Sequence, residues 1–216
     1  MTVRTKTALL ICVLGASWLA PRALPAQALS APDNWVTIAE RFVAMPPGWH
    51  ITTSGSVLLH NIKATAERQF GVRSEGFLFS GESDGTYGLF IGGRDLASDA
   101  AAWTSFEIGR DGTWVIRQRN ANTVEDLVGP QAGPVALPED GPAKNVLQIE
   151  AGESSVAFIL NDSTVAELPR EGMAVEGIFG FRVGANLNLH LTTLSTSEGD
   201  KVRSFAPQPA DEEAGS

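Results

Sequence analysis

Cysteine is nearly absent from this 216-residue sequence, which contains a single one, Cys12. If Cys12 leaves with an N-terminal leader, the mature chain has no disulfide, no thiol nucleophile and no cysteine metal ligand. Histidine is scarce as well, and the spacing of His50, His60 and His190 matches no metal-binding motif. Serine-triad, phosphate-loop and dinucleotide-binding motifs are also missing. The sequence therefore assigns no catalytic residue, and it predicts no metal site and no organic cofactor.

Residues 1–28 have the composition of a secretory signal peptide. Arg4 and Lys6 precede an apolar run over residues 7–20, and the Ala-Gln-Ala of residues 26–28 is a small-x-small cleavage site. The run is too short to span a bilayer and no second run of spanning length follows, so we expect no membrane span in the mature chain. We predict a secreted or periplasmic protein that is cleaved near Ala28. The alternative is an uncleaved N-terminal anchor.

Basic residues are fewer than acidic ones. The chain has 16 basic and 25 acidic residues, a net charge of −9, and cleavage of the leader would leave 13 basic residues against 25 acidic ones. An acidic surface repels nucleic-acid phosphates and anionic lipid, so we expect no nucleic-acid partner and no membrane-surface binding. Acidity also serves solubility, so it identifies no partner by itself.

Long amphipathic helical patterns are missing too, whereas about a dozen short strand candidates follow one another at hairpin spacing. This pattern predicts an all-β, antiparallel β-sandwich of the jelly-roll type. The apolar stretch over residues 86–93 predicts a central strand that is buried on both faces. Residues 29–196 are expected to form one domain, which contains a long loop over residues 128–144. Residues 197–216 are expected to be a disordered acidic tail.

The clearest hairpin runs from Trp103 to Arg119, with Arg-Asp-Gly of residues 110–112 at its tip. A three-residue loop with Gly112 in the left-handed conformation would pair Phe106 with Ile116 and Ile108 with Trp114. This register gives the hairpin one apolar face for the core and one polar face. The polar face would carry Ser105, Glu107, Val115, Arg117 and Arg119.

Four later segments carry a resemblance to a known fold family. They are Asn-Val-Leu-Gln-Ile at 145–149, Val-Ala-Phe-Ile-Leu-Asn at 156–161, Thr-Val at 164–165, and Gly-Ile-Phe-Gly-Phe-Arg-Val at 177–183. In this layout the chain resembles the concanavalin A-like jelly rolls over most of residues 48–195. The closest variety is the bacterial secreted domain labelled 3-keto-disaccharide hydrolase, also called domain of unknown function 1080.

The resemblance implies the fold and does not extend to hydrolysis. The turn at Asn161 and Asp162 differs from the family's Asn-Gly turn, and the Glu-rich and Ser-Gly-containing strands of the hydrolase-labelled members are missing. In a jelly roll, a sheet face outside the core can curve into a platform for sugars, which bind to planar hydrogen-bonding groups and a stacking aromatic ring.

We therefore predict an exported, non-catalytic jelly-roll module that binds carbohydrate or a glycoconjugate through a concave sheet face. The predicted ligand-binding residues are Arg73, Glu75, Tyr87, Trp103, Glu107, Arg117 and Arg119, with Trp49 as a further candidate for stacking. A lectin function requires an exposed aromatic ring beside Glu107 and Arg117. The alternative is a solvated sheet face with cross-strand ion pairs, which would favour a structural or protein-interaction domain of the cell envelope.

An enzymatic alternative needs two carboxylates that converge in one cleft. Glu75 and Glu107 are the best available pair for a glycoside hydrolase of the keto-disaccharide type. Glu82 and Asp84 begin the alternating carboxylate pattern of jelly-roll glucanases, but the third carboxylate is missing and the segment is expected to be a turn. The oxygen atoms of the same turn make a structural calcium ion near Glu82 and Asp84 a further alternative.

Overall fold

The computed structural model describes residues 35–37, 39–81 and 83–207, and these residues form fifteen β-strands and no helix. The strands are β1 (Trp35–Val36), β2 (Arg41–Ala44), β3 (Trp49–Thr52), β4 (Val57–Ala66), β5 (Phe70–Leu78), β6 (Thr86–Arg94), β7 (Ala102–Gly109), β8 (Thr113–Asn120), β9 (Thr123–Ala132), β10 (Ala143–Ala151), β11 (Ser155–Leu160), β12 (Ser163–Pro169), β13 (Gly177–Val183), β14 (Asn188–Glu198) and β15 (Lys201–Ser204). Within this described part, no helix is long and apolar enough to span a membrane. The all-β prediction is confirmed.

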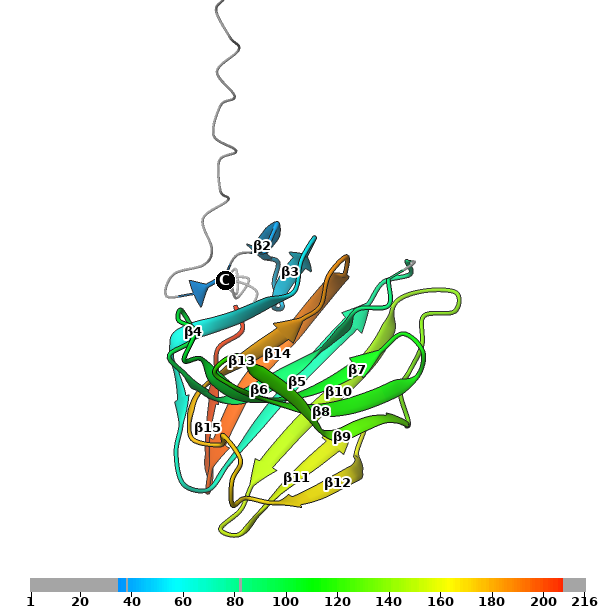
Figure 1. Cartoon of the computed structure of the whole chain (residues 1–216). Coiled ribbons are helices and arrows are strands. Elements are labelled where there is room, and N and C mark those ends of the chain that lie inside the picture. Colours follow the sequence, from blue (N-terminus) through cyan, green and yellow to red (C-terminus); the bar gives the residue numbers. More distant parts are fainter. Residues whose placement is uncertain (1–34, 38, 82, 208–216) are drawn as a thin grey trace, which may run out of the picture.

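The strands form two antiparallel sheets that pack face to face. The seven-stranded sheet has the order β1-β4-β13-β6-β7-β8-β9, and the eight-stranded sheet has the order β12-β11-β10-β5-β14-β3-β2. Figure 1 shows the two layers, with β7 and β8 of the first sheet in front of β5 and β10 of the second. Successive strands often lie in different sheets, as β3 and β4 do, so the sandwich closes through long-range pairing.

Alternating residues fill the space between the sheets. In β5, Phe70, Val72 and Leu78 are buried, whereas Arg73 and Glu75 between them are partly exposed on the outer side. This period of two is the pattern of a strand with one face in a core. Each buried aromatic or large aliphatic side chain contributes roughly 1.5–3 kcal/mol to folding relative to an exposed one.

Strand β6 is the central strand that its apolar sequence predicts. It lies between β13 and β7, and its residues from Tyr87 to Gly93 are buried. A Cβ atom at Gly88 would overlap the carbonyl oxygen of Phe106 on β7. Glycine is therefore required at this position, because the backbone of β7 passes directly over it.

The hairpin of β7 and β8 also has the predicted register. Phe106 pairs with Ile116 and Ile108 pairs with Trp114, and Gly112 at the tip has a φ of 79°. The separation of apolar and polar residues onto two faces of the hairpin therefore predicted the three-residue loop correctly.

The predicted loop over residues 128–144 is partly wrong. Strand β9 continues to Ala132, so only residues 133–142 connect it to β10. Pro130 favoured a loop because proline cannot donate to a sheet ladder. Since β9 is the edge strand of its sheet, a proline there is tolerated.

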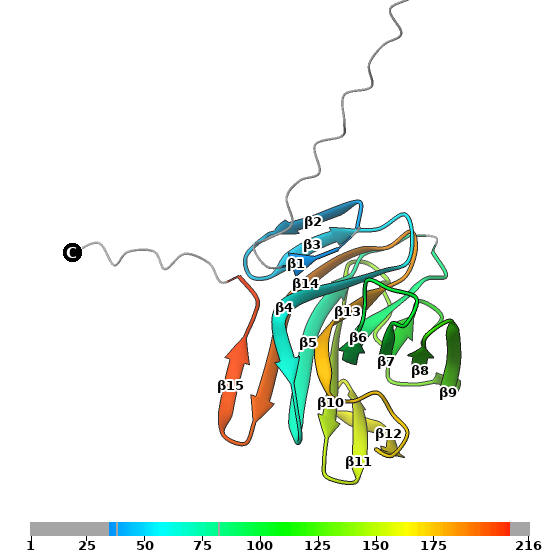
Figure 2. The ribbon, with the colours of Figure 1, turned by 60° about the vertical axis from the view of Figure 1, so that its left-hand side comes forward.

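The predicted domain boundary at residue 196 is also wrong. Strand β14 continues to Glu198, and β15 pairs with it at the side of the molecule opposite β8 and β9 (Figure 2). The Phe205 ring then lies 5.3 Å from the Phe179 ring between centroids, and the amide of Gly48 donates to the carbonyl of Pro207 at 3.0 Å. The domain therefore includes residues 197–207. The predicted signal peptide and the remaining tail, residues 208–216, lie outside the described residues.

Candidate functional site

The outer face of the seven-stranded sheet collects the polar residues of its central strands. Cross-strand pairing aligns Arg182 with Gly88, Ser105 with Arg117, and Arg117 with Asp126. We call this surface the polar face, and it comprises Trp103, Ser105, Glu107, Val115, Arg117, Arg119, Asp126 and Arg182.

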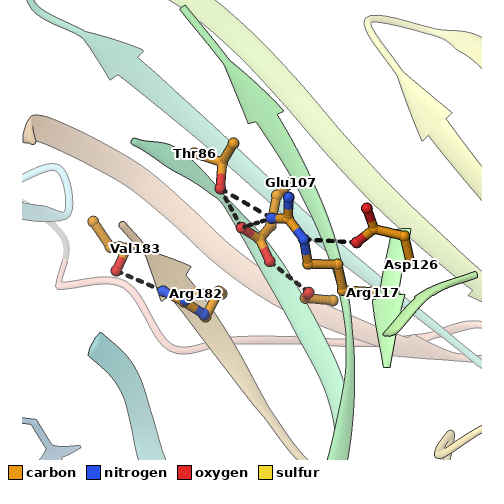
Figure 3. A network of polar contacts seen from close by, with 7 residues as sticks. Thr86, Glu107, Arg117, Asp126, Arg182 and Val183 are labelled. Carbon is orange, nitrogen blue, oxygen red and sulfur yellow. Dashed lines mark hydrogen bonds and ion pairs between the residues drawn. The ribbon is translucent and has the colours of Figure 1, made fainter. Parts of the chain in front are cut away.

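Glu107 is the anchor of the polar face. Its side chain is fully buried, its Oε1 accepts a hydrogen bond from Ser105 at 2.6 Å, and its Oε2 accepts hydrogen bonds from Thr86 and from Arg117, the latter at 3.1 Å. Figure 3 shows these contacts converging on the carboxylate. A buried carboxylate is tolerated only when it is paired and hydrogen-bonded, and Glu107 meets both conditions.

Arg117 is held between two carboxylates. Its Nη1 reaches Glu107, and its Nε donates to Oδ1 of Asp126 at 2.9 Å (Figure 3). The Arg117 side chain keeps 27% of its surface exposed. Two charge-assisted contacts fix the plane of the guanidinium, and its remaining exposed edge can meet a ligand without losing much conformational freedom.

Two hollows meet at Arg117. The first, which we call the arginine hollow, has a volume of about 350 Å³ and a lining that includes Leu58, Trp103, Arg117, Arg119, Val124 and Arg182. The second, which we call the turn hollow, has a volume of about 550 Å³ and a lining that includes Asp84, Thr86, Asp111, Thr113, Val115 and Arg117. Arg117 lines both hollows.

Arg182 and Trp103 lie against each other in the lining of the arginine hollow. The guanidinium carbon of Arg182 lies 6.0 Å from the centroid of the Trp103 ring, and Nη1 of Arg182 donates to the carbonyl of Val183 at 2.9 Å. Burial lowers the pKa of Arg182, and the nearby charge of Glu107 opposes this shift. Trp103 is only 4% exposed, and its buried Nε1 has no hydrogen-bond partner among the described atoms.

Four of the predicted ligand-binding residues are brought together on the polar face, namely Trp103, Glu107, Arg117 and Arg119. The prediction missed Arg182 and Asp126. Arg182 was detectable from the sequence, because the inward alternation of Phe179, Phe181 and Val183 places it outward. Asp126 was not, because its strand was not recognised.

Tyr87 and Trp49 do not lie on the polar face, and their assignment to sugar stacking is wrong. Tyr87 is 2% exposed in the core, where its hydroxyl lies 3.4 Å from Nδ2 of Asn145, and burial raises its pKa. Trp49 is fully buried against Phe181. The exposed aromatic ring that a lectin of the predicted kind requires is therefore missing from the described part of this face, where Trp103 is nearly covered.

Arg73 and Glu75 lie on the outer face of the other sheet. Glu75 contacts Lys144 at 2.8 Å and Arg73 at 3.9 Å there. Since β5 and β7 belong to opposite sheets, the core separates Glu75 from Glu107. These two residues cannot act as a catalytic pair in one cleft, and the prediction that Arg73 and Glu75 join the Glu107 face is wrong.

The predicted calcium position lies at the rim of the turn hollow. Asp84 lines that hollow, whereas Glu82 lies outside the described residues. Over residues 35–37, 39–81 and 83–207, no group of three or more histidine, cysteine, aspartate or glutamate residues is arranged to hold a metal ion. The calcium alternative stays a prediction.

No protein-family model matches the sequence, and no curated protein matches it significantly. Solved structures do. A carbohydrate-binding module, CBM66, from Bacillus subtilis superposes with a TM-score of 0.63 at 14% identity, over 76% of this chain and 96% of that one. A Bacillus subtilis protein of unknown function with a galectin-like fold gives 0.56 at 12% identity, over 76% and 88% of the two chains.

A third solved structure contains a bound saccharide product. The Bacteroides ovatus mixed-linkage glucan GH16 protein, in complex with a G4G4G3G product, gives a TM-score of 0.53 at 8% identity over 79% of this chain and 94% of that one. At identities this low, the likeness shows the fold alone. The chain therefore has the jelly-roll fold of the concanavalin A-like type that its sequence predicts. Its link to the keto-disaccharide hydrolase group stays a prediction.

Proposed function

We propose that this chain is an exported, non-catalytic module that binds carbohydrate through the polar face of its seven-stranded sheet. The observation that carries the proposal is that Arg117 lines two hollows, so recognition rests on guanidinium donors and not on the exposed aromatic ring of the predicted lectin. A guanidinium that is already oriented by Glu107 and Asp126 offers donors to sugar hydroxyl or carboxyl oxygens at little entropic cost.

The fold supports this proposal by analogy. Structures with the same architecture include a carbohydrate-binding module and a glucan-processing protein with a bound product. Because one fold can host many functions, the analogy alone identifies no ligand. The two hollows supply the evidence that is specific to this chain.

The carboxylates of the polar face favour binding over catalysis. Glycoside hydrolysis generally needs one carboxyl group as an acid and a second as a base or nucleophile, both facing the scissile bond. Glu107 has no exposed surface and Asp126 contacts the same guanidinium as Glu107. Since Glu107 cannot reach a glycosidic oxygen in this arrangement, we expect no hydrolysis.

Export is proposed from the sequence. The positively charged start, apolar run and Ala-Gln-Ala site of residues 1–28 are the parts of a cleavable leader. A secreted or periplasmic position would place the module among the polysaccharides of the cell envelope or its surroundings.

A glycan array tests the proposal, with the wild type beside the double variant Glu107→Gln/Arg117→Gln. The double change removes both members of the ion pair, so neither Glu107 nor Arg117 is left charged without the other. The control is Arg73→Gln/Glu75→Gln, which removes a partly exposed Arg–Glu pair from the opposite sheet. We expect saturable binding by the wild type and the control, and loss of binding in the double variant.

Binding that survives in the double variant, or that the control loses instead, would contradict the proposed face. If no glycan binds to the wild type, carbohydrate binding is wrong and the structural alternative takes its place. Melting curves of the wild type, the double variant and the control show whether a loss of binding comes from a loss of folding.

A further inference from the structure

The lining of the arginine hollow contains three guanidinium groups and no carboxylate. Arg117, Arg119 and Arg182 all contribute to it. The chain as a whole has 25 acidic residues and only 16 basic ones, so this local excess of positive charge runs against the overall balance. Concave surfaces with one sign of charge concentrate ligands of the opposite sign.

Two of the three arginines form no ion pair with a described carboxylate, although the charge of Glu107 lies near Arg182. Arg117 is paired with Glu107 and Asp126, but neither Arg119 nor Arg182 forms an ion pair with any described carboxylate. Each of the two donates to a backbone carbonyl, Arg119 to Ala121 at 2.7 Å and Arg182 to Val183 at 2.9 Å. A guanidinium carries five N–H donors, so most donors of both remain for a ligand.

The hollow is also poor in stacking surface. A neutral sugar is usually held partly by the face of an exposed aromatic ring, but Trp103 is 4% exposed and Arg182 lies over its ring. The available recognition groups are therefore the guanidinium donors of the lining. Such donors suit an oxyanion, since guanidinium binds carboxylate and sulfate-like groups in fixed, charge-assisted geometry.

We propose that the arginine hollow is a subsite for an oxyanion substituent on a sugar residue, the carboxylate of a uronic acid or a sulfate ester. The ligand of this module is then an acidic polysaccharide. This inference rests on the proposed carbohydrate-binding function and adds the ligand class to it. At about 350 Å³ the hollow lies near the lower end of the size range of ligand pockets, which fits one sugar unit.

Matched pairs of polysaccharides test the inference. Polygalacturonate is compared with its fully methyl-esterified form, and dextran sulfate is compared with dextran, by titration calorimetry at an ionic strength of about 0.15 M. Each pair keeps the backbone and removes the charge, and the two pairs separate carboxylate from sulfate. We expect at least one charged member to bind at least about tenfold more tightly than its neutral partner, because charge-assisted hydrogen bonds are lost in the latter.

Arg119→Gln is the test variant, because Arg119 lines the hollow without belonging to a buried ion pair. We expect it to weaken binding of the charged polysaccharide at least about tenfold. The control Arg73→Gln removes the same charge from the opposite sheet and should leave affinity within about twofold. Arg119→Lys keeps the charge without the planar fork, and we expect an intermediate affinity.

Equal affinity for charged and neutral members of both pairs would overturn the inference. The same holds if Arg73→Gln weakens binding as much as Arg119→Gln, because the attraction would then come from the chain as a whole. If a neutral glycan binds, and Glu107→Gln/Arg117→Gln abolishes that binding whereas Arg119→Gln does not, the proposed function is supported and the oxyanion subsite is wrong. Failure to bind any glycan, acidic or neutral, overturns both.

Discussion

Nη1 of Arg117 lies 3.1 Å from Oε2 of Glu107, and Glu107 has no solvent-exposed surface. A buried ion pair of this kind adds little net stability, but the loss of one partner leaves the other charge buried and unpaired. The stability of the sandwich and the shape of the proposed binding face therefore depend on the same two side chains.

We expect Arg117→Gln alone to lower the free energy of unfolding by about 3–5 kcal/mol, because it leaves the Glu107 carboxylate without its cation. The double change Glu107→Gln/Arg117→Gln should lower it by less than the single change. Asp126→Asn is the control, since the exposed ion pair with Asp126 is worth about 0.2–1 kcal/mol. Urea denaturation of the variants measures all three. A loss below about 1 kcal/mol for Arg117→Gln would contradict the assigned role of the pair.

Gly88→Ala should destabilise the chain by roughly 1–3 kcal/mol, because the added Cβ would overlap the Phe106 carbonyl of the neighbouring strand. Gly129→Ala on the edge strand β9 is the matched control. A Cβ atom at Gly129 meets nothing within 4 Å, so its effect should stay within about 0.5 kcal/mol. Thermal melting compares the two, and equal melting temperatures would be inconsistent with the close approach of β6 and β7.

Phe205→Ala should lower the melting temperature, since the ring packs edge-on against Phe179 and joins the last residues to the core. Truncating a core aromatic residue costs about 3–5 kcal/mol, and a partly buried one such as Phe205 should lose less than that. Val202→Ala is the control, because Val202 is 73% exposed. If Phe205→Ala melts like the wild type, the domain ends before β15 as the sequence predicted.

Tyr87 is the only tyrosine in the chain, so its ionisation can be followed without ambiguity. Burial raises its pKa above the ordinary value near 10, because the charged phenolate is disfavoured in the core. The stability that this shift contributes is present below about pH 10 and is lost as the pH rises toward the folded-state pKa. Absorbance at the phenolate band should stay flat through about pH 10 in the folded protein, while the urea-unfolded chain titrates there. A folded-state midpoint near the unfolded one would show that Tyr87 is solvated.

The local sequence pattern was sufficient to predict much of the fold. The register of β7 and β8 followed from the segregation of apolar and polar residues around Gly112, and the continuous apolar stretch of β6 marked a central strand. The edge strand β9 was missed because Pro130 signals a loop in any local reading. Only its place at the sheet edge makes that proline acceptable.

The site was harder to predict, because its residues converge through pairing between distant strands. Glu107 and Arg117 share a hairpin and were found together. Arg73 was misplaced because nothing in the sequence states which sheet β5 joins. Tyr87 was misplaced because β6 is apolar on both sides, so alternation could not show which face its ring takes.

The most direct test of the account is a crystal structure with a bound oligosaccharide taken from the glycan that the array identifies. The account predicts that the sugar lies on the polar face, with oxygen atoms within hydrogen-bond distance of Arg117 and Arg119. A sugar bound beside Arg73 and Glu75 on the other sheet would contradict it.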